Sequence, residues 1–195
     1  MPSLGFIRSF RSTLTRGLSL SAALLFGSHL SFAQLNSNTA IVTLNATMTE
    51  ALTVAATPSV VNFALANNGT AFGSAPVVIT TAWVLGAGRA NVVLDAYFAN
   101  PTAALTTGGA TPTNIPTSAV LGEDLMGTPS TYTAFTATGV VGTAGAGLEV
   151  FTQPLTALNR AYSRTDNLLL EINTTGLVLP AGSYTGTLTL QAQAL

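Results

Sequence analysis

The chain has 195 residues, six of them basic and seven acidic, with no cysteine and a single histidine. All six basic residues are arginines, and three of them precede Gln34 together with the histidine, His29. The rest of the chain lacks lysine, histidine and cysteine, which excludes Ser-His-Asp and Cys-His catalysis, imidazole or thiolate metal sites, and Schiff-base chemistry.

The first 33 residues are predicted to be a secretory signal peptide. Three arginines precede a short apolar core at residues 18–26, and the small residues Ser31 and Ala33 flank Phe32 before the expected cleavage site. A membrane anchor is the alternative, but a span needs about twenty apolar residues, and this core is about half as long. Later in the chain no apolar run is long enough to cross a bilayer.

Cleavage after Ala33 leaves residues 34–195, a length that suits a single domain. We expect this chain to pass through the periplasm and to be secreted or displayed at the cell surface. It carries three arginines against seven acidic residues, a net charge near −4. Because nucleic acids and anionic membrane surfaces are bound by basic patches, this charge argues against both as partners.

The mature chain begins with alternating residues that predict strands. In the segment 35–48, a polar lead is followed from residue 40 by apolar side chains at every second position, and Ile41 lies with polar residues on the other face. Residues 50–56 and 60–65 repeat the pattern, and Asn67-Asn68-Gly69 is a strong turn signal.

A hairpin is predicted next. Residues 77–85 and 92–98 are rich in β-branched and aromatic residues, and Gly86-Ala87-Gly88-Arg89 connects them. Trp83 has enough area to anchor a core between two sheets. Asp95, on the other face of the return strand, is expected to be solvated.

Two loops are predicted in the second half of the chain, among short strands at residues 118–125, 131–138, 148–152 and 167–173. Residues 100–117, with three prolines, read as a long exposed loop, and residues 139–147 as a flexible glycine-rich loop. The latter is not a phosphate-binding loop, because neither a lysine nor a helix follows it.

The chain ends in a turn and a long alternating stretch, residues 177–195. Pro180 and Gly182 suit a type I turn, and from Tyr184 onward apolar and polar residues alternate to the end. No window has helical periodicity. The sequence thus predicts an all-β fold of about eight to ten short strands, a sandwich or a barrel.

The available chemistry is sparse. Paired carboxylates are the one catalytic device left, but Glu123 and Asp124 would point to opposite faces of a strand, and no spacing forces the other acids together. No loop has the acidic density of a dedicated calcium site. We therefore predict no catalytic residues, no metal site and no cofactor, and we interpret Arg160, Arg164, Asp166 and Glu171 as a surface charge cluster.

The nearly uncharged, exported chain resembles bacterial pilus subunits of the chaperone–usher type and spore-coat-U-like secreted proteins. The resemblance lies in its alternating N-terminal segment and in its final stretch, Pro-Ala-Gly-Ser-Tyr-Thr-Gly-Thr-Leu-Thr-Leu. It implies an immunoglobulin-like Greek-key β-sandwich that lacks one strand, which the N-terminal extension of a neighbouring subunit supplies. Partners would be further copies, other surface subunits and a periplasmic chaperone.

On that resemblance, residues 34–48 contain the donated strand, and its inserting side chains are Ala40, Val42, Leu44 and Ala46. The acceptor groove would be bordered by the terminal strand, with Tyr184, Leu188, Leu190 and Ala192 as candidates. The expected role is a structural or adhesive surface protein that assembles by strand addition.

Two other functions are open on the residues alone. A complete, monomeric sandwich would be a binding module that presents residues 100–117 and 139–147 to a carbohydrate or protein ligand. A hydrolase that uses converging carboxylates is the third hypothesis.

Overall fold

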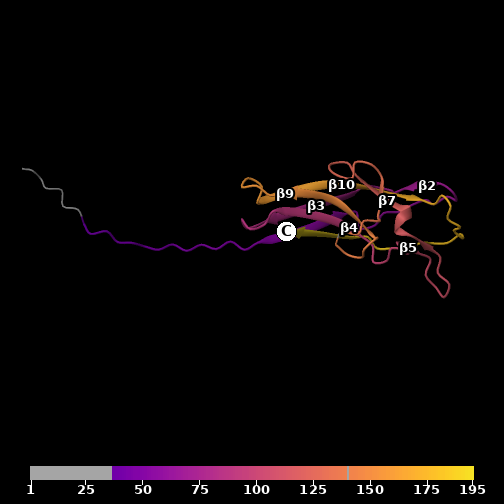
Figure 1. The fold of residues 1–195 in the computed structure, drawn as a ribbon, viewed down its shortest axis with the longest axis horizontal. Helices are drawn as coiled ribbons and strands as arrows, with labels where there is room; N and C mark the ends of the chain where they lie inside the picture. Colours follow the sequence, from indigo (N-terminus) through magenta and orange to yellow (C-terminus); the bar gives the residue numbers. More distant parts are fainter. Residues whose placement is uncertain (1–36, 140) are drawn as a thin grey trace, which may run out of the picture. The chain divides into compact units, whose positions relative to one another are not determined.

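A computed structural model describes residues 37–139 and 141–195 (Figure 1). The predicted signal peptide, residues 1–33, lies outside the described residues. The chain divides into two units, residues 1–45 and 46–195, and we call the second unit the body. In the first unit, residues 37–45 have no regular secondary structure, and each of them is exposed.

The body is all-β, and every strand pair in it is antiparallel. One sheet has the order β1-β3-β10-β7-β8, with β2 on β10, and a second has the order β11-β4-β9. The strands of the first sheet are β1 (Ala51–Thr57), β3 (Val77–Val84), β10 (Ala161–Asn173), β7 (Val120–Asp124), β8 (Thr133–Ala134) and β2 (Thr70–Phe72). Those of the second are β11 (Thr189–Ala194), β4 (Asn91–Tyr97) and β9 (Gly147–Pro154).

The remaining elements are short. Strands β5 (Leu105–Thr106) and β6 (Asn114–Ile115) form a hairpin, and the 3-10 helix η1 (Thr117–Ala119) follows it. In the part of the chain that the structure describes, no helix is long and apolar enough to span a membrane.

Both sheets contribute to one hydrophobic core. Its largest enclosed side chains include Phe135 and Phe151, and the Phe98 and Phe135 rings meet edge to face with centroids 5.2 Å apart. Trp83 is buried as predicted, and its indole Nε1 donates to the carbonyl oxygen of Asn159 at 2.8 Å. Each such enclosed side chain stabilises the fold by about 1.5–3 kcal/mol.

The predicted hairpin of residues 77–98 is wrong, because β3 and β4 lie in different sheets. β3 pairs with β1 and β10, whereas β4 pairs with β11 and β9. The apolar faces of both strands contribute to the shared core, so the connection at residues 85–90 passes from one sheet to the other. Alternation identifies the buried face of a strand but not its partner.

The predicted surface charge cluster is also wrong for two of its members. Arg164 and Asp166 alternate with Leu168 on the core-facing side of β10, and Asp166 is fully buried. The Arg164 guanidinium lies 2.6 Å from Asp166 and 3.8 Å from the carboxylate of Asp124, and it stacks over the Phe151 ring at 4.4 Å. Burial raises the pKa of Asp124, and the neighbouring Asp166 raises it further.

Asp95 is buried, not solvated. It is 2 % exposed, and its Oδ2 accepts a hydrogen bond of 3.0 Å from the backbone N–H of Val141. This bond attaches the loop at residues 139–147 to the outer face of β4. Burial raises the pKa of Asp95, and the nearby carboxylate of Glu149 adds to the effect, while the Val141 bond lowers it.

Stability should therefore fall as the pH rises through the raised pKa of Asp95. Between the ordinary value of about 3.9 and the raised native value, the folded chain binds more protons than the unfolded chain, so rising pH favours unfolding. Asp95→Asn keeps an acceptor for Val141 and cannot ionise. We expect the urea midpoint of the wild type to fall below that of Asp95→Asn as the pH increases over this window.

Glu50→Gln is a control for which the pH dependence of stability has the opposite sign. Hydrogen bonds from the Arg89 side chain and the Gly86 backbone lower the pKa of Glu50, so its contribution is present above the unfolded pKa and is lost as the pH falls. Wild-type and Asp95→Asn midpoints that stay parallel across the pH series would contradict the account of Asp95.

Candidate functional site

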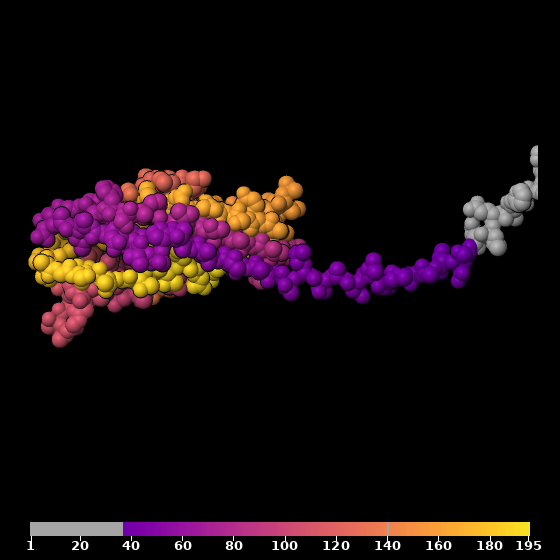
Figure 2. Space-filling view, turned by 180° about the vertical axis from the view of Figure 1, so that it is seen from behind, coloured from indigo at the N-terminus to yellow at the C-terminus, as the bar shows by residue number. Residues whose placement is uncertain are grey.

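The core of the body is uncovered along one side, where a groove of about 920 Å³ lies between two chain segments. We call residues 58–65 the first wall and residues 182–190 the second wall. In Figure 2, the purple early segment and the yellow terminal segment run along the same side of the body. Core residues of β3, β7 and β10, together with the residue that follows β4, form the floor, namely Val77, Phe98, Val120, Leu170 and Ile172.

Burial is unequal on the two sides of the core. The inward side chains of β3 and β10 are mostly enclosed, whereas those of both walls are only half-buried. The half-buried wall residues are Val61, Phe63, Leu65, Tyr184, Leu188 and Leu190. The apolar faces of the walls therefore lack a covering layer in the described chain.

The second wall has an unpaired backbone edge. Thr185 exchanges both of its backbone hydrogen bonds with Thr106 of β5, at 2.9 Å each. In an extended chain the neighbouring residues point their N–H and C=O groups the opposite way. Within residues 37–139 and 141–195, those groups of Tyr184, Gly186 and Leu188 have no backbone partner.

The first wall is similar. Asn62 pairs with Ser74 on the side away from the groove, through a backbone bond of 2.9 Å. Val61 and Leu65 form no backbone hydrogen bonds in the described chain. A trough with an apolar floor between two strand edges that have free donors and acceptors is the geometry that accepts an additional extended strand.

A close approach at Gly186 shapes the second wall. A Cβ at this position would overlap the carbonyl oxygen of buried Ala104 and would come within 3.1 Å of Leu105 Cγ. Glycine therefore permits the β5 segment to lie directly against the wall, where Thr106 pairs with Thr185.

A network of hydrogen bonds around Thr174 joins the chain segments that lead to the two walls. Thr174 is 1 % exposed; its hydroxyl accepts from Gly69 N–H at 3.0 Å and lies within donating distance of the carbonyls of Ala66 and Gly69. Asn68, in the left-handed region with φ 49°, accepts from Gly176 N–H at 3.1 Å. The turn after the first wall is thus joined to the start of the connection to the second wall.

Thr174→Val should loosen this network, because it leaves the half-buried Gly69 N–H unsatisfied. We expect a loss of about 1–3 kcal/mol in the free energy of unfolding, measured by urea denaturation. Thr174→Ser should retain nearly all of the stability. Thr175→Val, at the neighbouring exposed position, is the control. Equal effects of the two valine substitutions would contradict this role for the Thr174 hydroxyl.

The predicted groove residues lie at the site with one exception. Tyr184, Leu188 and Leu190 line the groove, and the Tyr184 hydroxyl donates to the carbonyl of Pro180 at 2.9 Å. Ala192 does not line it; this residue lies in β11 opposite Leu94 and is partly buried against the core. The regular terminal strand is shorter than predicted, since β11 starts only at Thr189.

The donor candidates Ala40, Val42, Leu44 and Ala46 are all exposed, with Val42 at 78 % and Leu44 at 88 %. Ile41 and Met48 are also exposed, at 91 % and 85 %. The segment has the alternation of a strand but no strand partner in the described chain. The first wall was not predicted as part of the site, although its alternation at residues 60–65 was visible in the sequence.

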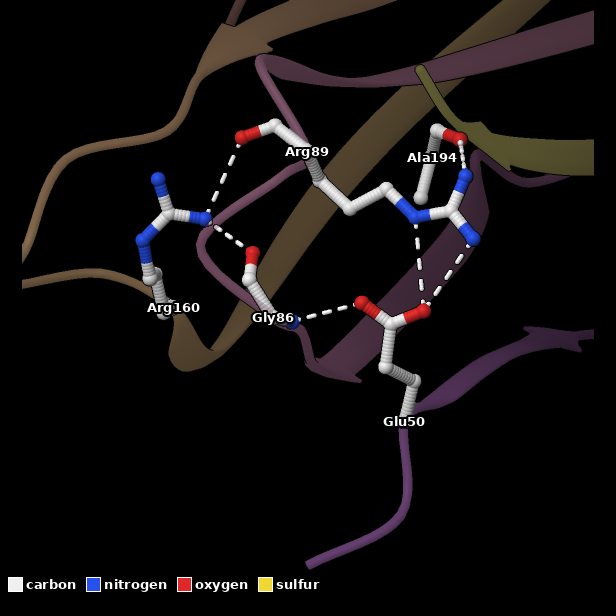
Figure 3. A network of polar contacts seen from close by, with 5 residues as sticks. All are labelled: Glu50, Gly86, Arg89, Arg160 and Ala194. Atoms are coloured by element: carbon white, nitrogen blue, oxygen red, sulfur yellow. Dashed lines mark hydrogen bonds and ion pairs between the residues drawn. The ribbon is translucent and has the colours of Figure 1, made fainter.

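A charged clamp holds the start of β1 at one end of the body (Figure 3). The Glu50 carboxylate accepts from Gly86 N–H at 2.6 Å and from the Arg89 side chain at 3.1 and 3.3 Å. Arg89 also donates to the carbonyl of Ala194 in the terminal strand, and Arg160 donates to the carbonyls of Gly86 and Arg89. The clamp thus joins β1, the 85–90 connection and β11.

The two loops considered as ligand-presenting segments are largely attached to the body. Residues 100–117 were predicted to be an exposed loop, but Ala104, Ile115 and Thr117 are buried and β5 pairs with β6. The Tyr97 ring lies directly on Gly142, so the 139–147 loop is held against β4 there as well as at Val141. In the described chain, no three His, Cys, Asp or Glu side chains are grouped as they would be around a metal ion.

No protein-family model, curated protein or solved structure matches the chain.

Proposed function

We propose that this protein is a secreted structural or adhesive surface subunit that assembles by β-strand addition. Residues 40–46 of one copy fill the groove of the next copy, pair with the free edges of its walls and cover its core. The proposal keeps the expected partners, namely further copies of this chain, other surface subunits and a periplasmic chaperone.

The observation that carries the proposal is the strand order around the groove. An immunoglobulin-like sandwich has strands A, B, E and D in one sheet and C, F and G in the other. With β9 and the short strands set aside, β1, β3, β4, β7, β10 and β11 fit places A to F in chain order, because β1-β3-β10-β7 are successive neighbours and β4 is next to β11. Strand β9, on the other edge of β4, has no counterpart among these places. Strand G would lie on the free side of β11, and none of the described strands pairs with β11 there.

The chemistry of the N-terminal segment supports the same role. Residues 40–46 and the second wall from Tyr184 to Leu190 are equally long, and a seven-residue strand extends about 23 Å. Val42 and Leu44 gain the most from burial, because they are now mainly in water. Neither residues 37–49 nor the residues that line the groove include a charged side chain, so no charge is buried on insertion.

The direction of insertion determines what is built. Every strand pair of the body is antiparallel, so we expect the inserted segment to run antiparallel to the second wall. The donated strand of each copy then leads to a different neighbour, which is a heterologous contact that continues into an open polymer. Parallel insertion would instead favour a closed, reciprocal dimer.

A labelled peptide of residues 37–48 tests the proposal on the full chain. The acceptor is the double variant Val42→Asp, Leu44→Asp, whose own segment cannot be buried while its groove is unchanged. We expect saturable one-to-one binding by fluorescence anisotropy, slow release, and little dependence on salt, because no charges take part. A peptide with the same two aspartates should not bind; equal binding of the two peptides would refute the proposal.

A further inference from the structure

We infer that consecutive bodies in the polymer touch end to end, through a second interface outside the groove. One side of it is the base face, formed by Glu50 with the loops at residues 86–89 and 155–160. The other is the groove-end face of the next copy, formed by the turn at residues 66–69 and the connection at residues 174–183. This inference rests on the proposed function.

The two faces lie at opposite ends of the body. At the base face, Leu85 N–H bonds to the carbonyl of Arg160, and Leu155 N–H bonds to the carbonyl of Ala90, so these connections share one end. At the groove-end face, the Thr174 network joins the turn at 66–69 to the 174–183 connection. Strand β10 runs from Ala161 at the first end to Asn173 at the second.

The short spacer at residues 47–49, between the donated strand and the clamped start of β1, requires the contact. Ala46 is the last inserting residue, and Glu50 is already held by the charged clamp at the base face. Four residue steps extend at most about 14 Å, less than the diameter of a small domain. An antiparallel insertion brings Ala46 out at the groove end, so the base face of the donor must lie against that end of the acceptor.

The composition of the two faces suits such a contact. On the groove-end face, residues 66–69 and 174–183 include no Asp, Glu, Lys or Arg, and depletion of charge is typical of the centre of protein interfaces. On the base face, Glu50 and Arg89 neutralise each other, and the charge of Arg160 is directed to the carbonyls of Gly86 and Arg89 within the same face. Each face also carries an almost fully exposed aliphatic side chain, Leu158 at 95 % and Val178 at 93 %, and Met48 of the spacer is 85 % exposed.

Cross-linking tests the contact cleanly, because the natural chain has no cysteine. Full-length Leu158→Cys, Val178→Cys and the double variant are assembled, treated with a short bis-maleimide, and boiled in SDS to separate non-covalent polymers. We expect a covalent ladder from the double variant, dimers from a mixture of the two single variants, and monomer from each single variant alone. The control is the double variant Met126→Cys, Val178→Cys. Because Met126 belongs to neither of the two faces, this variant should give no ladder.

The outcomes separate the inference from the function on which it rests. Unboiled, SDS-resistant polymers without any covalent ladder in the double variant would overturn the end-to-end contact and leave strand addition standing. Cross-linked dimers from Leu158→Cys alone would show that base faces meet each other, which also overturns it. Absence of SDS-resistant polymers from every sample would refute the proposed function itself.

Discussion

Replacing Val42 and Leu44 together by aspartate is expected to abolish self-assembly while leaving the body folded. Both side chains are exposed in the described chain, so the charges cost nothing in the free subunit. On insertion each carboxylate would enter an uncharged groove, and the penalty for burying an unpaired ion is several kcal/mol. A loss of about 4 kcal/mol weakens binding about a thousandfold. Size-exclusion chromatography at matched concentration measures the shift from polymer to monomer.

The matched control places the same charges on the other face of the same segment. Thr43→Asp and Asn45→Asp alternate with the inserting residues, so their side chains point away from the floor of the groove. This variant should assemble like the wild type. If it fails to assemble and the Val42, Leu44 variant still polymerises, the assigned face of the donated strand is wrong.

Gly186→Ala is expected to damage the groove from the acceptor side. The new methyl group would overlap the carbonyl of Ala104, so the second wall must move away from β5, and overpacking of this kind costs about 1–3 kcal/mol. Movement of the wall displaces the edge at Tyr184, Gly186 and Leu188 that the donated strand would pair with. We expect the affinity for the 37–48 peptide to fall about tenfold or more, in a chain that still unfolds cooperatively.

Gly88→Ala is the control for this substitution, because no atom lies within 4 Å of the added Cβ. Its peptide affinity and its urea midpoint should equal those of the wild type. A Gly186→Ala chain that loses stability but keeps full affinity would show that the second wall does not contribute to binding.

Sequence alternation was sufficient for the fold class and for most of the buried faces. Val77, Ile79 and Trp83 lie on the enclosed face of β3, and the terminal apolar residues face inward as their spacing required. The antiparallel sheets of the all-β body confirm the coarse prediction. The immunoglobulin-like Greek-key arrangement stays a proposal.

Only one wall of the groove could be predicted from the sequence, because the groove lies where a neighbouring strand is missing. Residues 60–65 alternate like a paired strand, yet only Phe63 takes part in a bridge, to Gly73. The same pattern therefore describes a strand that is paired and one whose partner is absent. Likewise, Arg164 and Asp166 lie on the same alternating face as Leu168. Because they are charged, the sequence predicted that they face solvent, whereas in the structure they form a buried ion pair.

The measurement that tests the central claim most directly is electrophoresis of the assembled protein in SDS, with and without boiling. A donated strand that pairs along both walls can leave only by breaking many contacts at once, which gives slow dissociation. The account predicts a ladder without boiling that collapses to a single band on heating, since the chain has no cysteine for covalent links. A single monomer band under both conditions, with a monomer in native sizing, would contradict it.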